Sequence, residues 1–225
     1  MGAGLDLLLP PVCPACGDAA RGLCQPCHRQ LSRRPELGCV RCGDPVLATA
    51  RCGRRHDDLR RVSQLVAPLR FVGTGGRLVR RFKLDGDATA GRLLAREMAD
   101  AWRVAGRMPR PLLVPVPLHR ARLRRRGFDQ ARWLASGVAE RLRLRALAGV
   151  LARVRATRPQ GDPLVRSRAD NVRGAFAVRR PKAIRGRDVL LVDDVFTTGA
   201  TARACAGILR EAGARSVSLL VACRS

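Results

Sequence analysis

The sequence predicts an α/β fold in which helices flank a parallel sheet, with a small cysteine-rich zinc module in front of it. Residues Val189–Val192 form a continuous run of valine and leucine, which is typical of a strand buried on both faces of a parallel sheet. A helical stretch at Ala200–Ala212 separates this run from a second apolar run at Ser216–Ala222. Seven of the nine cysteines lie between residues 13 and 52, which indicates a separate metal-binding module.

Composition narrows the classes of function. The chain has 225 residues, of which 46% are hydrophobic and 28% charged, and this suits one soluble domain with a small module attached. No apolar run approaches the roughly 20 residues needed to cross a bilayer. The opening residues lack the basic region and the cleavage site of a signal peptide. We therefore expect a cytoplasmic protein without a membrane span.

The chain is strongly basic. Lysine and arginine number 44 against 18 acidic residues, for a formal net charge of +26. Lys83 and Lys182 are the only lysines, so the other basic residues are arginines. Such a charge attracts the phosphates of a metabolite, of RNA or of DNA, although a codon bias toward arginine accounts for a large part of the excess. Charge alone indicates an anionic partner and does not identify it.

The amino-terminal cysteines form three C-x-x-C pairs followed by a single cysteine. Each pair can present two thiolates to one tetrahedral Zn²⁺, and two pairs complete a closed structural site. Disulfides would need an oxidising compartment, and redox-active C-x-x-C chemistry normally uses one pair on a βα unit. We therefore expect residues 1–57 to form a zinc-ribbon module with structural zinc. Its predicted metal ligands are Cys13, Cys16, Cys24, Cys27, Cys39, Cys42, Cys52 and His56.

The second group of ligands is incomplete. Cys39, Cys42 and Cys52 supply three sulfurs, but Arg55 stands where a fourth cysteine would complete the set. His56 could supply an imidazole as the fourth ligand, or it could be an ordinary surface histidine, and the sequence favours the two interpretations about equally. Either one or two zinc ions are compatible with these residues.

Residues 62–225 are expected to form the α/β domain, with linker space at about residues 57–61. Six elements are expected before the buried run at 189–192. They are a strand at Leu65–Val72, helices at Gly73–Leu84 and Ala88–Ala105, a strand at Leu112–Val116, a helix at Ala131–Leu144 and a strand at Gly174–Val178. The run Asp85-Gly86-Asp87 separates the first two helices, and Asp129 is a candidate cap for the third.

A dense basic segment follows the expected strand at 112–116. Five of the seven residues 120–126 are arginine, and we expect them to form a loop. Guanidinium groups pack poorly in a core and neutralise phosphates well, which suits pyrophosphate or a nucleic-acid backbone. The residues expected to meet pyrophosphate here are Leu118, His119, Arg120 and Arg126.

The most informative segment is DVLLVDDVFTTGAT at residues 188–201. The buried strand ends in Asp193 and Asp194, and a short loop at Val195–Gly199 leads into a helix. Two threonine hydroxyls, a glycine and the N–H groups of the helix start suit a phosphate group. Adjacent carboxylates would repel that phosphate, but they are useful as acceptors for sugar hydroxyls or beside a bound Mg²⁺. A turn residue and a helix cap would explain one such residue, not the whole set.

This string resembles the phosphoribosyl pyrophosphate (PRPP) signature of type I phosphoribosyltransferases, whose fold is a Rossmann-like parallel sheet flanked by helices. The resemblance implies that Asp193 and Asp194 are the catalytic residues and hold the ribose 2′- and 3′-hydroxyls, and that PRPP binds with Mg²⁺. The threonines and Gly199 would then surround the 5′-phosphate. The PRPP-binding residues implied in this way are Asp193, Asp194, Val195, Phe196, Thr197, Thr198, Gly199, Ala200 and Thr201.

The order of motifs along about residues 5–223 resembles the ComF family. The motifs are the C-x-x-C ribbon, Phe82-Lys83, VPVPLH at 114–119, RGFDQA at 126–131 and the stretch from Gln160 through Arg168 and Asn171 to Gly-Ala-Phe at 174–176. The resemblance implies a zinc ribbon joined to a phosphoribosyltransferase domain, in bacterial competence proteins that handle single-stranded DNA during natural transformation. Asp129 departs from the usual asparagine of the family.

Two functions are therefore expected. The first is a DNA-handling competence protein that retains PRPP binding, with single-stranded DNA and proteins of the competence machinery as partners. The second is an active phosphoribosyltransferase, in the glycosyltransferase class, that moves ribose 5-phosphate from PRPP to an acceptor and releases pyrophosphate. The residues identify no acceptor pocket, so enzyme activity is left open.

Overall fold

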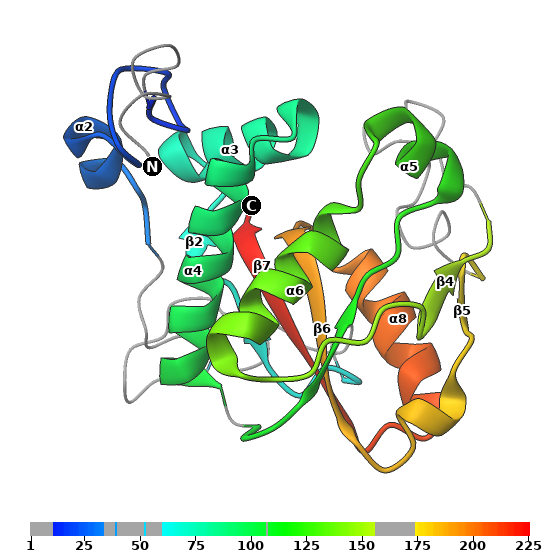
Figure 1. Ribbon diagram of the computed structural model, residues 1–225. Helices are drawn as coiled ribbons and strands as arrows, with labels where there is room; N and C mark the ends of the chain where they lie inside the picture. The colour runs from blue at the N-terminus through cyan, green and yellow to red at the C-terminus, as the bar shows by residue number, and fades with distance from the viewer. Residues whose placement is uncertain (1–10, 34–38, 40–51, 53–59, 107, 156–173) are drawn as a thin grey trace.

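A five-stranded parallel sheet organises the chain, as the sequence predicts. The computed structural model describes residues 11–33, 39, 52, 60–106, 108–155 and 174–225 (Figure 1). The strand order is β1-β7-β6-β3, and β2 pairs with β7 beyond the end of β1. The two longest strands, β6 (Asp188–Phe196) and β7 (Ser216–Arg224), pair in register along their whole length at the centre of the sheet.

Helices cover both faces of this sheet. Val189 and Leu191 of β6 belong to one core cluster, together with apolar residues of α8 (Ala200–Glu211). Leu190 and Val192 belong to a second cluster, together with residues of α4 (Ala88–Ala105) and α6 (Gln130–Leu142). This alternation follows from the two-residue period of a strand. Figure 1 shows β6 and β7 between α6 and α8.

Local signals account for the helix boundaries. The side chain of Asp87 caps α4 by accepting the N–H groups of Thr89 and Ala90 at 2.8 and 3.0 Å. Asp129 caps α6 by accepting the N–H of Arg132 at 3.0 Å, so this expected cap is confirmed. None of the helices in the described part of the chain is long and apolar enough to cross a bilayer.

The first strand and helix are more broken than predicted. The expected strand at 65–72 is two short strands, β1 (Leu65–Val66) and β2 (Leu69–Arg70), because Pro68 has no N–H to donate to the sheet. The expected helix at 73–84 is α3 (Gly73–Arg80), continued by a π-helical turn, η2 (Arg81–Asp85). Turns of this wide type are rare and frequently mark functional sites.

Two further segments differ from expectation. The basic segment is a helix, α5 (Arg120–Arg126), and not a loop, because arginine is a good helix former and both ends are capped. His119 Nδ1 accepts the N–H of Ala121 at one end, and Gly127 adopts φ 81° at the other. An unpredicted strand, β4 (Leu151–Arg153), pairs antiparallel with β5 (Phe176–Val178), away from the main sheet.

The remaining elements are short. The strand expected at 112–116 is β3 (Leu112–Pro115), which pairs with β6, and η3 (Pro181–Ala183) is one turn of 3₁₀-helix before β6. The cysteine-rich module contributes helix α2 (Gln25–Arg29), which begins directly after Cys24. Cys13 and Cys27 of this module are buried in the same core cluster as α4, so the module packs against the α/β domain.

Candidate functional site

Strand β6 carries its two acidic residues close to its carboxyl end. The strand was expected to end at Asp194, but it continues through Val195 to Phe196, and Asp193, Val195 and Phe196 each pair with a residue of β7. Since adjacent side chains of a strand point to opposite faces, Asp193 continues the face of Leu191 and Asp194 continues the face of Val192. The two carboxylates therefore lie on opposite faces of β6, close to its carboxyl end.

Asp194 is buried and paired with a lysine. Its exposed fraction is 4%, and Lys83 Nζ lies 2.6 Å from its Oδ2. Lys83 comes from η2, which Figure 1 shows flanking the carboxyl end of β6 on the side opposite to α5. The charge of Asp194 also acts on the guanidinium of Arg126, whose own pKa is lowered by burial. Two basic groups from two separate segments thus converge on one carboxylate.

Asp193 lies in a different environment. Burial, and then the negative charge of Asp194, raise the pKa of the Asp193 carboxyl well above its usual range, whereas Lys83 acts in the opposite direction. Its Oδ1 accepts the backbone N–H of Asp194 at 2.9 Å. The charge of Asp193 acts on Arg153, whose pKa is lowered mainly by burial. Arg153 belongs to β4 and stacks on the ring of Phe176 at 5.3 Å.

A short turn centred on Gly199 follows β6. Gly199 has φ 76° and leads into α8, and a β-carbon at this position would lie 2.8 Å from the ring of Phe196. Glycine is therefore needed both for the backbone conformation and for the space. No side chain caps the first N–H groups of α8. These donors, and the positive end of the helix dipole, therefore face the turn. Arg203 Nη1 donates to the carbonyl of Thr198 at 2.7 Å and adds positive charge there.

The segment expected to meet pyrophosphate consists of helix α5 and the residues before it. His119 is the N-cap of α5, so its Nδ1 is already engaged with a backbone N–H. Asp129 Oδ2 accepts the N–H of Leu118 at 3.4 Å while its Oδ1 caps α6, so this residue connects the loop to the helix. Arg120 is exposed, whereas Arg126 is half-buried and its charge interacts with that of Asp194.

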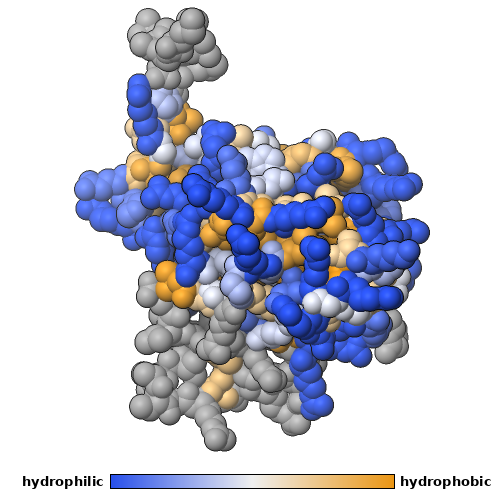
Figure 2. Space-filling model, turned by 60° about the horizontal axis from the view of Figure 1, so that its bottom comes forward, coloured by the Kyte–Doolittle hydropathy of each residue, from blue (hydrophilic) through white to orange (hydrophobic). Residues whose placement is uncertain are grey.

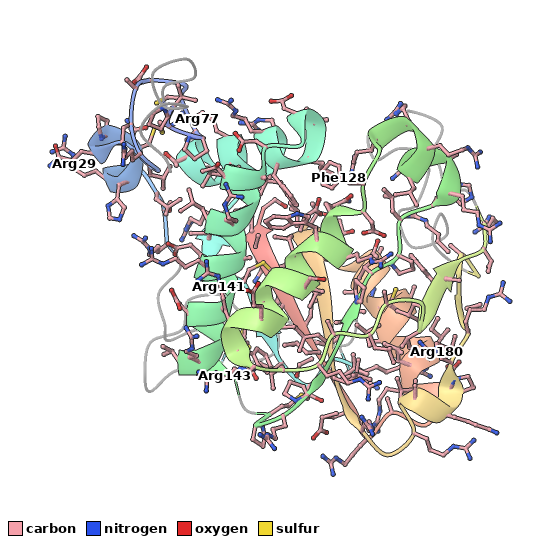
Figure 3. All side chains as sticks on the ribbon, viewed as in Figure 1. Arg29, Arg77, Phe128, Arg141, Arg143 and Arg180 are labelled. Atoms are coloured by element: carbon pink, nitrogen blue, oxygen red, sulfur yellow. The ribbon has the colours of Figure 1, made fainter. Side chains whose placement is uncertain are left out.

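An aromatic cluster supports the lysine. The ring of Phe82 lies 5.3 Å from that of Phe128 and 5.2 Å from that of Trp133, in tilted arrangements. A β-carbon on Gly91 would lie within 2.8 Å of both the Phe82 and Trp133 rings, so α4 approaches this cluster closely. Phe82 is fully buried and directly precedes Lys83 in η2 (Phe128 is labelled in Figure 3). The cluster therefore fixes the turn from which the lysine reaches Asp194.

Four cysteines form a compact ligand set in the amino-terminal module. The sulfurs of Cys13, Cys16, Cys24 and Cys27 all lie within 4.8 Å of one another. A tetrahedral zinc site with Zn–S bonds near 2.3 Å has sulfurs about 3.8 Å apart, and the Sγ atoms of Cys16 and Cys24 are 3.6 Å apart. Burial alone would raise the pKa of Cys13, but backbone N–H groups, among them that of Cys24, lower it to about 6. The arrangement fits a structural zinc ion.

Helix α3 contributes a residue to the surroundings of this metal site. Arg77 Nη2 lies 3.7 Å from Cys27 Sγ, 3.2 Å from Gln30 Oε1 and 3.0 Å from Thr74 Oγ1. Figure 3 shows Arg77 reaching from α3 toward the cysteine cluster. Donors of this kind stabilise thiolate ligands and orient them. Arg77 therefore joins the module to the α/β domain.

The second predicted ligand group is only partly within the described residues. Cys39 and Cys52 are half-buried and pack against the core cluster on the α8 face of the sheet. Cys42 and His56 lie outside the described residues, as do Gln160, Arg168 and Asn171.

Several proteins are similar to this chain over about 90% of its length. The double zinc ribbon domain family matches residues 4–55, and the phosphoribosyl transferase domain family matches residues 128–225. Competence protein F of Haemophilus influenzae is 30% identical over 207 residues, which cover 89% of this chain and 90% of the relative. The DNA utilization protein YhgH of Salmonella typhi is 34% identical over 212 residues, which cover 91% of each chain. The chain belongs to the ComF family.

Solved structures similar to this ComF-family protein include a hypoxanthine phosphoribosyltransferase from Staphylococcus aureus. It is 15% identical, covers 58% of this chain and 61% of its own, and superimposes with a TM-score of 0.36. The parallel sheet and the two domain families confirm the predicted fold class, a phosphoribosyltransferase-like domain with an amino-terminal zinc ribbon.

Three basic residues of the site in this ComF-family protein were not predicted as site residues from the sequence. In the sequence, Lys83 stands out only as part of a family motif, and Arg153 and Arg203 are single residues among many arginines. The scarcity of lysine was the one usable signal for Lys83. For the two arginines no local signal existed, because only the packing of β4 and α8 brings them to the end of β6.

Proposed function

We propose that this protein binds PRPP at the carboxyl end of β6 and handles single-stranded DNA during natural transformation. The observation that carries the first part is the combination of two carboxylates at the strand end with the uncapped start of α8, one turn further along the chain. Sugar hydroxyls suit the carboxylates, and a 5′-phosphate suits the helix start. The names of its relatives, a competence protein and a DNA utilization protein, support the second part.

The basic groups around the carboxylates suggest how PRPP would lie. With its 5′-phosphate on the backbone of Thr197–Thr201, the pyrophosphate would extend toward α5, where Arg126 and Arg120 provide positive charge. The ribose would lie between these groups, over Asp193 and Asp194. Lys83 would then share Asp194 with a ribose hydroxyl, because the carboxylate has a second oxygen to offer.

Mg²⁺ is the cation expected with PRPP, where it neutralises pyrophosphate charge. Lys83 already neutralises Asp194, so that carboxylate is a poor direct ligand for a second cation. Asp193 continues the other face of the strand, and its ionised carboxylate would be the ligand for Mg²⁺. When bound, the ion would stabilise negative charge on a leaving pyrophosphate.

An active phosphoribosyltransferase is the second candidate function. The half-buried Arg126 favours it, because a guanidinium in a partly desolvated position stabilises a departing pyrophosphate more strongly than an exposed one. Catalysis would be largely electrostatic, with ribose carbon 1 becoming cation-like as its bond to pyrophosphate breaks and the bond to an acceptor nucleophile forms. A PRPP-binding protein without turnover would need the same residues for binding alone.

Calorimetric titration of the zinc-loaded protein with PRPP and Mg²⁺, combined with a pyrophosphate-release assay on the same samples, tests both candidates. Saturable binding without release, alone or with candidate acceptors, is expected for a DNA-handling protein with a PRPP-binding site. Release that depends on one acceptor would instead establish the enzyme and name its substrate. Absence of binding would refute the proposed role of residues 193–201.

A further inference from the structure

A basic pocket lies at the amino ends of the strands, whereas the two carboxylates lie near the carboxyl end of β6. It has a volume of about 380 Å³, and the strands that meet it do so at their amino ends, β3 at Leu112, β6 at Asp188 and β7 just after Arg215. Half of its ten lining residues are arginines, although arginine and lysine together make up 44 of the 225 residues of the chain. These arginines are Arg110, Arg143, Arg145, Arg187 and Arg215.

The lining segments come from four parts of the chain and are joined by backbone hydrogen bonds. The N–H of Leu113 donates to the carbonyl of Arg145 at 2.9 Å, which fixes the segment after α6 beside β3. The N–H of Arg215 donates to the carbonyl of Arg187 at 2.8 Å, which fixes the turn before β6 beside the start of β7. The arginine side chains therefore project from a backbone that the sheet holds in place.

Positive charge in the pocket is largely uncompensated. Asp188 is the one acidic residue of the lining, and it is bonded to Arg215 through both carboxylate oxygens and to Ser216 Oγ at 2.6 Å. These bonds hold the pKa of Asp188 below its usual range. The other four arginines of the pocket form no ion pair with an acidic residue in the described part of the chain. An anion in the pocket would meet four guanidinium groups and no free carboxylate of the lining.

One of these arginines is held in an unfavourable backbone conformation. Arg143 follows α6 with φ 53°, and it is the one residue other than glycine with a positive φ among those described. Glycine or asparagine usually occupies this position after a helix, because a β-carbon is strained there. Strained conformations of this kind cluster at ligand-binding and other functional sites. Figure 3 shows Arg143 beyond the end of α6.

The rest of the lining indicates what kind of anion fits. The five other residues are Pro111, Leu112, Leu144, Gly186 and Asp188. They include no aromatic ring on which a base could stack, and no serine, threonine, asparagine or glutamine that would select one metabolite. Figure 2, which brings this end of the molecule forward, shows hydrophilic side chains spread across it. Recognition through charge alone suits the repeated phosphates of a nucleic-acid backbone.

We propose that this arginine pocket binds the sugar–phosphate backbone of single-stranded DNA. This inference rests on the proposed DNA-handling function. It places the DNA-binding surface at the amino ends of the strands, remote from the carboxylates of β6. Exposed arginines flank the lining segments, Arg141 before Arg143 and Arg185 before Gly186, and extend the basic surface along a strand of DNA. DNA and PRPP would then bind at the same time, without competing.

Paired charge removals test the surface. Binding of fluorescein-labelled oligothymidylate is followed by fluorescence anisotropy at several salt concentrations. The pocket variant is Arg145→Gln with Arg187→Gln, and the matched control is Arg29→Gln with Arg92→Gln, which removes the same charge from exposed positions elsewhere. We expect the pocket variant to bind about tenfold more weakly and to lower the slope of log affinity against log salt by about 1.4, or about 0.7 per lost phosphate contact. The control should change both quantities far less.

A single substitution separates binding from folding. Arg143→Gly removes a guanidinium and relieves the backbone strain, so its melting temperature should equal or exceed that of the wild type while its DNA affinity falls about threefold or more. A purely structural role of Arg143 would leave DNA affinity unchanged.

The outcomes distinguish this inference from the function on which it rests. Equal weakening in the pocket and control variants would overturn the pocket as the DNA surface and leave DNA handling intact. A wild-type protein that binds no oligothymidylate would overturn DNA handling itself. Binding of inorganic pyrophosphate that the pocket variant loses, with DNA affinity unchanged, would make this a site for small anions and overturn the inference.

Discussion

Lys83 Nζ lies 2.6 Å from Oδ2 of the buried Asp194, so the π-helical turn after α3 is electrostatically tied to the end of β6. The two residues come from opposite ends of the α/β domain in sequence. Their pairing neutralises one of two adjacent carboxylates, which allows both to lie in a largely buried strand. It also places an ammonium group at the proposed position of the ribose.

Removing this lysine should therefore affect both stability and ligand binding. In Lys83→Met, Asp194 loses its cation, and we expect the free energy of unfolding to fall by about 2 kcal/mol, since the lysine is partly exposed. PRPP affinity should fall about tenfold, because Asp194 loses the ion pair that holds its carboxylate at the proposed ribose position. Chemical denaturation and calorimetry measure the two effects. Lys83→Arg should retain most of the stability and most of the PRPP affinity. Adding Asp194→Asn to Lys83→Met should recover the lost stability.

Replacing both carboxylates should separate the two proposed binding functions. Asp193→Asn with Asp194→Asn should abolish PRPP binding and leave DNA affinity unchanged or slightly higher, because two negative charges are lost far from the arginine pocket. Calorimetry with PRPP and anisotropy with oligothymidylate provide the readouts. Asp100→Asn, an exposed change on α4, serves as the control. A collapse of DNA affinity in a folded double variant would mean that the sites overlap.

Stability and PRPP binding should depend on pH in opposite directions. Burial and the charge of Asp194 raise the pKa of Asp193, so the folded chain holds its proton more tightly than the unfolded chain. The stability that this proton contributes is complete below the ordinary carboxyl pKa and is lost as pH rises through the raised folded pKa. PRPP binding should strengthen over the same range, because an ionised carboxylate accepts hydroxyl hydrogen bonds.

Melting temperatures from mildly acidic to mildly alkaline pH check this expectation. Asp193→Asn cannot ionise, so its melting temperature should vary less with pH than that of the wild type. An equally steep decline in the variant would assign the pH dependence to another group.

Glycine at position 199 should be required for the phosphate turn. In Gly199→Ala, the positive φ costs about 1–2 kcal/mol, and the new methyl group meets the Phe196 ring, so PRPP binding should be lost. Gly149→Ala is a matched control, because its φ of 75° imposes the same backbone cost while nothing lies within 4 Å of the new β-carbon. Loss of PRPP binding in both variants would point to global destabilisation and not to the turn.

Zinc affinity should depend on Arg77. Because Arg77 Nη2 contacts Cys27 Sγ, we expect Arg77→Met to weaken zinc binding by about 10-fold or more, as measured by competition with a chromophoric chelator. Arg80→Met, which lies on the same helix and contacts Phe71, should have little effect. Removal of zinc by a chelator should lower the melting temperature of the whole chain, since Cys13 and Cys27 share a core with α4. Unchanged zinc affinity in Arg77→Met would exclude a role for this contact.

Local sequence signals were sufficient for some parts of the site. Three local patterns each indicate a local structure: the apolar run of β6, the glycine before α8 and the spacing of the first four cysteines. The β6–α8–β7 unit and a four-cysteine cluster could therefore be predicted. The cap of α6 by Asp129 was also predictable, because a capping side chain acts on its own chain neighbours. The structure of α5 was not, because a run of arginines suits a solvated helix as well as a loop.

Short-range units could therefore be read from the sequence: a buried strand that carries two carboxylates near its carboxyl end, a glycine turn into a helix, and C-x-x-C pairs suited to one metal. The tertiary packing, in contrast, brings Lys83 and Arg153 from distant segments to these carboxylates, and it gathers five arginines around one pocket at the amino ends of the strands. The reason is physical. Caps and turns depend on neighbours in the chain, whereas the partner of a buried charge depends on which helices cover each face of the sheet.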